Sequence, residues 1–207
     1  EQIRTSAATI DATGNIDIDA VTVRSGQQPD DLYHKLHRLS EEKQLELLRK
    51  NLNLSSYDIT GYHCKELGTV IPSIEEEVQI KGHNYATVTG KRMFLLPAIL
   101  SRDGAKLDKE ENRQSEIRFD FAFRDIDTVR ITLPAGYKPE SVMAPVSLSC
   151  KFGNYNAAIT IEGNTLTLIR KVERNSGVFP PADFPELVNF YSTVYKGDRG
   201  RVVLVKE

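Results

Sequence analysis

The chain has 207 residues, of which 27 are Lys or Arg and 29 are Asp or Glu, so its formal net charge is −2. This near balance argues against a protein that binds nucleic acid through bulk positive charge. Hydrophobic residues make up 40% of the chain and charged residues 27%, a composition typical of a folded globular protein rather than a disordered one. Trp is absent, which argues against a site that stacks sugar rings.

Three further features of the sequence limit the class of protein: the cysteines, the apolar runs and the first residue. The two cysteines, Cys64 and Cys150, form no C-x-x-C pattern, so we expect no structural zinc and two buried thiols, whose pairing the sequence leaves open. The longest apolar stretch, residues 93–100, contains Pro97 and falls short of the roughly 20 residues that a membrane span needs. Because the chain begins at Glu1 without Met or a signal peptide, we expect a processed protein or a piece of a longer one.

Residues 5–23 predict a β-hairpin. The turn falls at residues 13–15, where Gly and Asn tolerate the positive φ that tight turns require. Along the second strand the apolar positions change phase after Ala20 and continue at Val21 and Val23. The phase change predicts a β-bulge near Ala20.

Two stretches have helical periodicity. In residues 30–52, leucines recur every three or four positions, and Ser40 in their midst is a candidate N-cap, which predicts two short helices or one kinked helix. Residues 183–195 form the second stretch, where Asp183 and Glu186 have the spacing of a capping box.

From residue 57 onward, strand patterns dominate. The strongest lies at residues 116–124, where four apolar residues alternate with charged ones and are expected to share one buried face: Ile117, Phe119, Phe121 and Phe123. Further strands are predicted at residues 129–133, 146–152, 155–161, 165–174 and 201–205, with turns at 153–154 and 163–164. Residues 101–115 and 196–200 read as polar loops. The acidic run of residues 75–77 is expected to form a solvated surface.

Successive strands with tight turns predict a mainly β protein, an antiparallel, jelly-roll-like β-sandwich. The helical stretches then form an insertion near residues 30–52 and a short C-terminal helix near 183–195. We expect a single domain over residues 1–207, with a possible subdivision near 101–115.

No catalytic or metal-binding group emerges from the spacing. The candidates for a nucleophile and its base are two cysteines and four histidines, namely Cys64, Cys150, His34, His37, His63 and His83. Adjacent residues of a strand point to opposite faces, so His63 and Cys64 cannot form a dyad. His34 and His37 have a spacing that can share a metal ion, but no third ligand accompanies them, and we expect a solvated pair. We therefore expect neither a metal nor a cofactor.

The last third of the chain carries segments that point to a family. These are ITLPAGY at 131–137, RKVER at 170–174, FPPADFPEL at 179–187, Phe190-Tyr191, Asp198 and VVL at 202–204. They resemble the C-terminal region of large bacterial transglutaminase-like proteins, in which a β-domain precedes a papain-like core and a β-sandwich domain of unknown function follows it. The early hairpin and the helix at 30–52 look like the start of that last domain. The resemblance thus covers most of the chain, and residues 127–205 most closely.

The resemblance implies an accessory domain rather than an enzyme. The family's catalytic Cys, His and Asp belong to the core, and neither Cys64, followed by Lys65, nor His83, followed by Asn84, matches them. It implies docking against an upstream core domain of the same polypeptide, in the periplasm or at the cell surface. A ligand-binding sandwich for carbohydrate or peptide is the alternative, and an independent hydrolase comes third.

Aromatic residues concentrate around the C-terminal helix. Phe179 and Phe184 lie in a lead-in that prolines stiffen, and Tyr191 and Tyr195 follow on the helix. A stiff aromatic segment loses little entropy on docking, so these four residues are the predicted docking surface. The alternative is that they cap the core of the sandwich.

Overall fold

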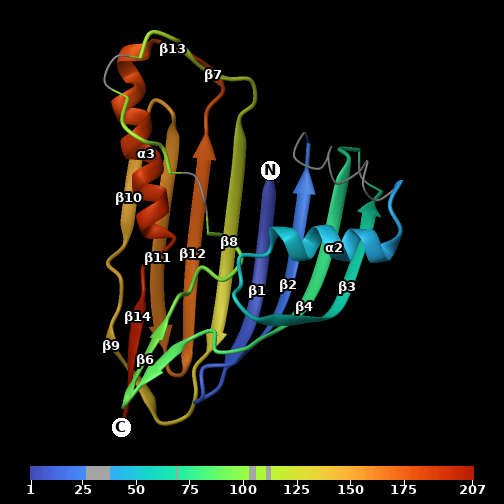
Figure 1. Cartoon of the computed structure of the whole chain (residues 1–207), viewed down its shortest axis with the longest axis vertical. Helices are drawn as coiled ribbons and strands as arrows, with labels where there is room; N and C mark the ends of the chain where they lie inside the picture. The colour runs from blue at the N-terminus through green and yellow to red at the C-terminus, as the bar shows by residue number, and fades with distance from the viewer. Residues whose placement is uncertain (27–37, 69, 103–105, 111–112) are drawn as a thin grey trace.

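The computed structural model describes residues 1–26, 38–68, 70–102, 106–110 and 113–207. It is mainly β, with a large eight-stranded sheet in the order β10-β11-β12-β8-β1-β2-β4-β3, a four-stranded sheet in the order β5-β6-β14-β9, and the pair β13-β7 (Figure 1). Among the described strands, every pair is antiparallel except β1 with β8. The predicted class, with antiparallel sheets and a short C-terminal helix, is confirmed.

The large sheet comprises β1 (Gln2–Ile10), β2 (Ile16–Ser25), β3 (Tyr57–Leu67), β4 (Ser73–Gly82), β8 (Phe123–Thr132), β10 (Val146–Cys150), β11 (Gly153–Glu162) and β12 (Thr165–Arg174). The smaller sheets comprise β5 (Thr87–Thr89), β6 (Arg92–Leu95), β7 (Ile117–Phe119), β9 (Tyr137–Ser141), β13 (Gly177–Phe179) and β14 (Val202–Lys206). The helical elements are α2 (Glu41–Asn51), the 3-10 turn η1 (Pro181–Asp183) and α3 (Phe184–Gly197).

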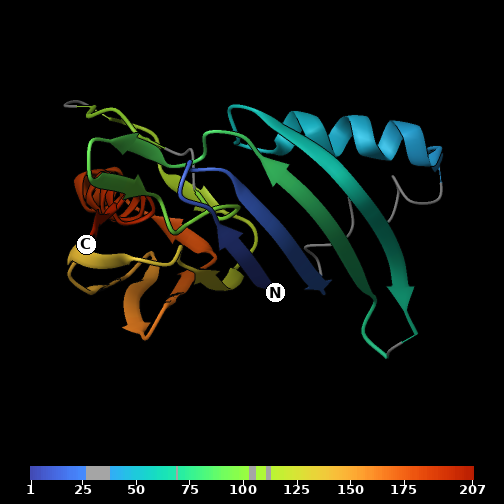
Figure 2. The same cartoon turned by 90° about the horizontal axis from the view of Figure 1, so that it is seen from below.

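The two faces of the large sheet differ in their cover. Figure 2 shows that α3, the four-stranded sheet and α2 all lie over the same face, which we call the inner face. Its apolar residues form the core together with Met93, Leu95, Val202 and Leu204 of the small sheet, all of which are fully buried. Over the opposite face, the outer face, the described residues form no such layer (Figure 2). Because β6 pairs with β14, segments from both sides of residues 101–115 share one sheet.

The first hairpin forms as predicted, but without a bulge. The pairing of β1 with β2 is unbroken, from Gln2 opposite Arg24 to Ile10 opposite Ile16, so the expected bulge near Ala20 is wrong. Val21 instead lies on the outer face, 39% exposed, while Thr22 continues the buried phase. At the turn, Gly14 has a φ of 91°.

Helix α2 begins directly after Ser40, as predicted, although no side-chain hydrogen bond caps it. Instead, the Ser40 carbonyl accepts a hydrogen bond from the Gln44 amide. Leu48 and Leu52 pack against the core from this helix and its end. The first part of the expected helical stretch, residues 30–37, lies outside the described residues.

The predicted strand at residues 116–124 is split, and the expected burial of Phe121 is wrong. Strand β7 ends at Phe119 and pairs with β13, whereas β8 begins at Phe123 and pairs with β12 and β1. Residues 120–122 therefore cross between two sheets, which leaves Phe121 57% exposed. The guanidinium group of Arg174 stacks over Phe119 and Phe123, at 4.5 and 4.8 Å from the ring centroids.

The turn between β10 and β11 falls two residues earlier than expected, at Lys151 and Phe152. Gly153 begins β11 with a φ of 152°, and a Cβ added there would lie 1.9 Å from the Glu173 carbonyl oxygen. Close approach of two backbones therefore explains this glycine better than a turn does. Phe152, expected on a strand, is fully buried at the turn.

Helix α3 starts at the predicted place but uses its acidic residues differently. Asp183 makes no side-chain cap hydrogen bond. Asp183 and Glu186 instead both pair with the Lys151 ammonium group, at 2.8 and 3.3 Å. The polar loop expected at residues 196–200 is wrong in its start and in its exposure, because α3 continues to Gly197 and Asp198, in the turn that follows, is only 1% exposed.

Candidate functional site

Charged side chains occupy the middle of the inner face, where apolar residues would be expected. Arg4 of β1 and Arg170 of β12 both lie directly opposite Asp127 of β8, so the three side chains share one face. Asp198, just beyond α3, reaches the same group from the layer above. We call Arg4, Asp127, Arg170 and Asp198 the ionic ladder.

Short hydrogen bonds connect the ionic ladder. The two Asp127 carboxylate oxygens accept from Arg4 Nη1 at 3.2 Å and from Arg170 Nη1 at 3.0 Å. Arg170 also donates from Nε and Nη2 to the two oxygens of Asp198, at 2.6 and 2.8 Å. The hydroxyl of Tyr155 donates to the same Asp198 carboxylate at 2.9 Å. Asp127 and Arg170 are 0% and 4% exposed, so the pairing takes place away from water.

Burial and mutual attraction compete in the pKa values of this group. Burial raises the pKa of Asp127 above its usual value, and the neighbouring Arg4 and Arg170 oppose that rise. Burial also disfavours the charged form of Arg170, but its hydrogen bonds to Asp198 and the charge of that carboxylate hold the pKa of Arg170 above its usual value. Arg170 therefore keeps its charge at the centre of the fold.

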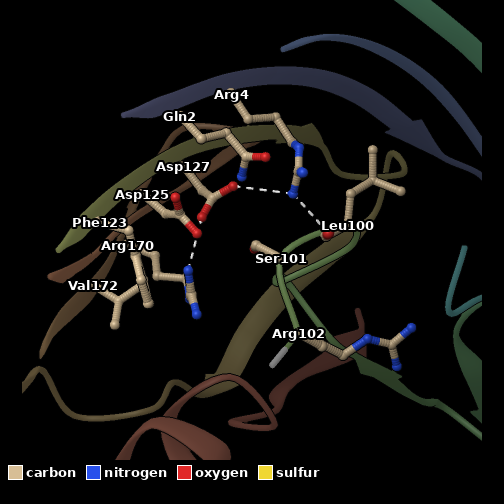
Figure 3. A pocket seen from close by; sticks show the side chains of 10 residues that line it. All are labelled: Gln2, Arg4, Leu100, Ser101, Arg102, Phe123, Asp125, Asp127, Arg170 and Val172. Carbon is tan, nitrogen blue, oxygen red and sulfur yellow. Dashed lines mark hydrogen bonds and ion pairs between the residues drawn. The ribbon is translucent and has the colours of Figure 1, made fainter. Parts of the chain in front are cut away.

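A pocket of about 190 Å³ opens beside the ionic ladder (Figure 3). Its lining includes Arg4, Asp127 and Arg170 from the large sheet, and Leu100 and Ser101 from the segment that follows β6. The remaining lining residues are Gln2, Arg102, Phe123, Asp125 and Val172. Arg4 connects the two walls, because its Nη1 also donates to the Leu100 carbonyl oxygen at 2.6 Å.

A second polar group continues the pattern toward the far edge of the sheet. Glu76 of β4 is 8% exposed and accepts from Arg24 Nη1 at 3.0 Å and from the Tyr62 hydroxyl at 3.3 Å. Glu75 and Glu77 point to the outer face and pair with Lys65. The expected solvated surface is therefore found only in part: Glu75 and Glu77 lie on the outer face, whereas the two-residue period of the strand buries Glu76.

The two cysteines lie on strands β3 and β10, which are the opposite edges of the eight-stranded sheet. With strands about 4.8 Å apart, they are separated by roughly 30 Å along the sheet, far beyond the distance a disulfide can bridge. Both thiols are free. Burial, with the charge of nearby Glu76, raises the pKa of Cys64 to about 11, which works against formation of a reactive thiolate.

The two histidines that the structure describes, His63 and His83, do not join either cysteine in a catalytic arrangement. His63 is exposed on the face of β3 opposite to Cys64, as predicted. His83 lies 2.9 Å from the Asp58 carboxylate at an exposed position. His34 and His37 lie outside the described residues. The part of the chain that the structure describes holds no group of three or more His, Cys, Asp or Glu suited to a metal ion.

The four residues of the predicted docking surface are largely covered, and Phe184 and Tyr195 lie near opposite ends of α3. Phe184 and Tyr191 are 8% and 9% exposed and belong to the core. Phe179 and Tyr195 are partly buried. Phe179 packs 4.6 Å from Phe152, ring centroid to ring centroid. Their docking role stays a prediction.

The ionic ladder was not among the sequence-based candidates, although a signal for it existed. Arg170 stands between Leu168 and Val172 in the buried phase of β12, and Asp127 precedes Val129 and Ile131 in the buried phase of β8. A charge in an apolar phase predicts a buried partner, because an unpaired buried charge is very costly. Asp198 carries no comparable signal, since nothing in its local sequence places it over the sheet.

The fold and site define a two-layer, mainly antiparallel β domain with a charged pocket on its covered face. Residues 91–204, more than half of the chain, match the family described as "Domain of Unknown Function with solved-structure structure (DUF3858)", and the chain belongs to that family. The expectation of a domain of unknown function is thereby confirmed.

The comparison with solved structures gives a more distant similarity. A structure described as that of a "putative protease" from Parabacteroides distasonis ATCC 8503 is similar over 55% of this chain, with 20% identity and a TM-score of 0.43. The similar region makes up 23% of that longer chain. No curated protein matches. Among the described helices, none is long and apolar enough to cross a membrane.

Proposed function

We propose that this chain is a non-catalytic accessory domain that docks against a neighbouring domain of the same polypeptide, a transglutaminase-like core that precedes it. The segments within residues 127–205 that resemble the C-terminal domain of such proteins support this proposal, as does membership of the DUF3858 family. The same resemblance supports a location in the periplasm or at the cell surface.

The observation that carries the docking proposal is an apolar row on the outer face of the large sheet. Ile3 of β1 lies directly opposite Val23 of β2 and Ile126 of β8. Val21 and Ile169 lie in the neighbouring row of the same face, two residues along the strands, opposite Thr5 and Thr128 respectively. Ile3, Val21 and Ile169 are 44%, 39% and 56% exposed. The solvated face of an antiparallel sheet is normally polar, so adjacent Ile and Val residues there favour contact with another domain.

The composition of this row suits an interface within one polypeptide. Thr5 and Thr128 lie between its apolar members, and Lys171 borders it next to Ile126. Interfaces between domains of one chain are more polar than those of obligate dimers, which resemble a divided core. We therefore assign the row to a neighbouring domain rather than to a second copy.

The test compares substitutions on the outer face with a control substitution elsewhere on this domain. Ile3→Lys and Ile169→Lys are expected to weaken association of this domain with the neighbouring domain at least about tenfold, since each places a charge in the interface. Val178→Lys is the control, because Val178 is 52% exposed but lies on β13, away from the row. Association is measured by calorimetry between the separately produced domains, and the folding of each variant by circular dichroism.

Three outcomes contradict the proposal. The first is a reading frame that encodes no second domain. The second is an equal effect of the row variants and the control. The third concerns the non-catalytic role, which fails if this chain turns over peptide or glutamine-donor substrates and loses that activity on Cys64→Ala or Cys150→Ala.

One observation, the pocket beside the ionic ladder, favours the second candidate function, a ligand-binding β-sandwich. The pocket lies on the inner face, on the side of the sheet opposite the apolar row. Ligand binding there is compatible with docking through the outer face.

A further inference from the structure

We propose that the pocket beside the ionic ladder binds a singly charged carboxylate group attached to a small apolar moiety. Guanidinium groups, a hydroxyl group without a hydrogen-bond partner among the described residues, and apolar side chains line the pocket. Each of these features supports the proposal.

The first feature is an incompletely used arginine. Arg4 donates from Nε to Thr22 Oγ1 and from Nη1 to the Leu100 carbonyl and Asp127. Among the described residues, its Nη2 donates no hydrogen bond. The two N–H groups of Nη2 therefore remain to donate to a carboxylate oxygen of a ligand, and such charge-assisted hydrogen bonds are strong.

The second feature is Ser101 on the opposite wall. The residue is 9% exposed, and its Oγ is buried without a hydrogen-bond partner among the described residues. Figure 3 shows the side chain directed from its segment into the pocket, toward the side on which Arg4 and Arg170 lie. Burying a hydroxyl group without a hydrogen-bond partner is unfavourable, and a carboxylate oxygen of a ligand would accept its hydrogen bond.

Charge limits the ligand to a single negative charge. Three arginines line the pocket, but so do Asp125 and Asp127, and Asp198 engages Arg170 from behind. The charges of this group therefore nearly cancel. A doubly charged phosphate would meet two carboxylates without a matching excess of positive charge, whereas a monocarboxylate needs only the donors of Arg4 and Ser101.

Size and wall chemistry define the rest of the ligand. The volume of about 190 Å³ is below the roughly 300 Å³ at which pockets for drug-sized ligands begin. Leu100, Phe123 and Val172 supply apolar walls for a short hydrocarbon part. Two sources share this chemistry: a small free carboxylic acid and the C-terminal residue of a peptide.

The experiment follows the Nε–H signals of Arg4 and Arg170 and the Ser101 amide signal by NMR during titration. The probes are N-acetylleucine, N-acetylleucinamide, the peptide Ala-Ala-Leu with a free carboxylate, the same peptide amidated, inorganic phosphate and butylamine. We expect both free carboxylates, or one of them, to shift these signals saturably, and the amides to leave them unchanged. Binding of N-acetylleucine alone identifies a small-acid site, and tighter binding of the peptide acid identifies a peptide C-terminus.

Variants connect binding to the named groups. Ser101→Ala is expected to weaken carboxylate binding about tenfold, since a hydrogen bond to a charged group is lost. Arg4→Lys keeps a positive charge beside Asp127 but loses the N–H donors of Nη2, and should weaken binding by a similar factor. Ser147→Ala is the control, because Ser147 is exposed and bonds to Asn156 on β11.

Four results would overturn the proposal. They are the absence of saturable shifts with either acid, equal binding of an acid and its amide, equal or tighter binding of phosphate or butylamine, and full binding by Ser101→Ala. If Arg4→Lys fails to fold, the comparison of acid with amide and the Ser101 variant still decide. A failure here leaves the docking proposal intact, because that one is tested on the outer face.

Discussion

Replacing Asp198 by Asn tests whether the ionic ladder holds the two layers of the fold together. The substitution keeps the size of the side chain but removes its charge. The Asp198 carboxylate accepts hydrogen bonds from Arg170 at 2.6 and 2.8 Å and from the Tyr155 hydroxyl at 2.9 Å. An Asn side chain has one carbonyl oxygen, and its amide nitrogen cannot accept from Arg170.

The expected cost follows from the burial of Arg170. Removing one partner of a buried ion pair typically costs about 3–5 kcal/mol, because the remaining charge is left uncompensated. Asp127 still pairs with Arg170 at 3.0 Å, which offsets part of that loss. We therefore expect Asp198→Asn to lower the free energy of unfolding by about 3 kcal/mol.

Guanidinium-induced unfolding measures this change, with Glu140→Gln as the matched control. Arg92 also binds the two oxygens of Glu140 in a fork, at 2.6 Å each, but Arg92 is 57% exposed at its side chain. Exposed ion pairs contribute about 0–1 kcal/mol, so the control should cost less than about 1 kcal/mol. If both variants cost the same, burial is not the source of the stability of the ladder, and the reasoning fails.

Two further predictions follow from burial. Phe152→Ala should lower the free energy of unfolding by about 3–5 kcal/mol, because Phe152 is fully buried. Phe121→Ala should lower it by less than about 1 kcal/mol, because Phe121 is exposed. Denaturant-induced unfolding measures both changes, and a comparable loss in the two variants would contradict the split of the strand at residues 116–124. In a Cys150→Ser background at pH 8, Cys64 should react with iodoacetamide about a hundredfold more slowly in the folded chain than in urea, because its pKa is raised from 9.0 to about 11. Since the folded state favours the neutral thiol, the contribution of Cys64 to stability is complete below pH 9 and falls as the pH rises toward 11. Equal alkylation rates in the folded chain and in urea would refute the raised pKa of Cys64.

Local patterns in the sequence predicted most elements, because turn chemistry and periodicity act over a few residues. The first hairpin has its glycine at the turn, and helices α2 and α3 begin where Ser40 and Asp183 indicated. The pattern failed at residues 116–124 for a reason that lies outside that segment. Two-residue alternation records which face is apolar but not which strand is the partner, and this stretch changes partner between β7 and β8.

The candidate site depends on long-range pairing, and for that reason only part of it was accessible. The buried phases of β8 and β12 place Asp127 and Arg170 inside. Their mutual pairing requires the register of two strands more than 30 residues apart. Asp198 requires in addition that α3 end above β12, which is a property of the assembled layers.

Part of each central strand has its charged residues on the covered face and its apolar residues on the exposed face, the reverse of an ordinary half-buried sheet. This reversal links the two proposals. At one level of the sheet, three strands place a charged residue inside and the preceding Ile outside. The pairs are Ile3–Arg4 on β1, Ile126–Asp127 on β8 and Ile169–Arg170 on β12. A shift of the strand pairing by one residue would bury these isoleucines and expose the charged side chains. Taken alone, these three pairs of residues therefore disfavour the observed strand register.

The register is held by the other half of the same strands, where Ile10, Ile131 and Leu166 are fully buried on the inner face. Exposed isoleucines remain an unfavourable feature unless another surface covers them, and buried charges remain unfavourable unless their donors and acceptors are satisfied. Docking through the outer face would cover the exposed isoleucines. A carboxylate in the pocket would accept hydrogen bonds from the donors that the buried charged group leaves unused. Double substitution Ile3→Thr with Ile169→Thr separates the two: it should weaken docking while leaving the NMR shifts caused by N-acetylleucine unchanged, because the altered side chains lie on the face opposite to the pocket. Loss of both would mean that the two faces act as one site.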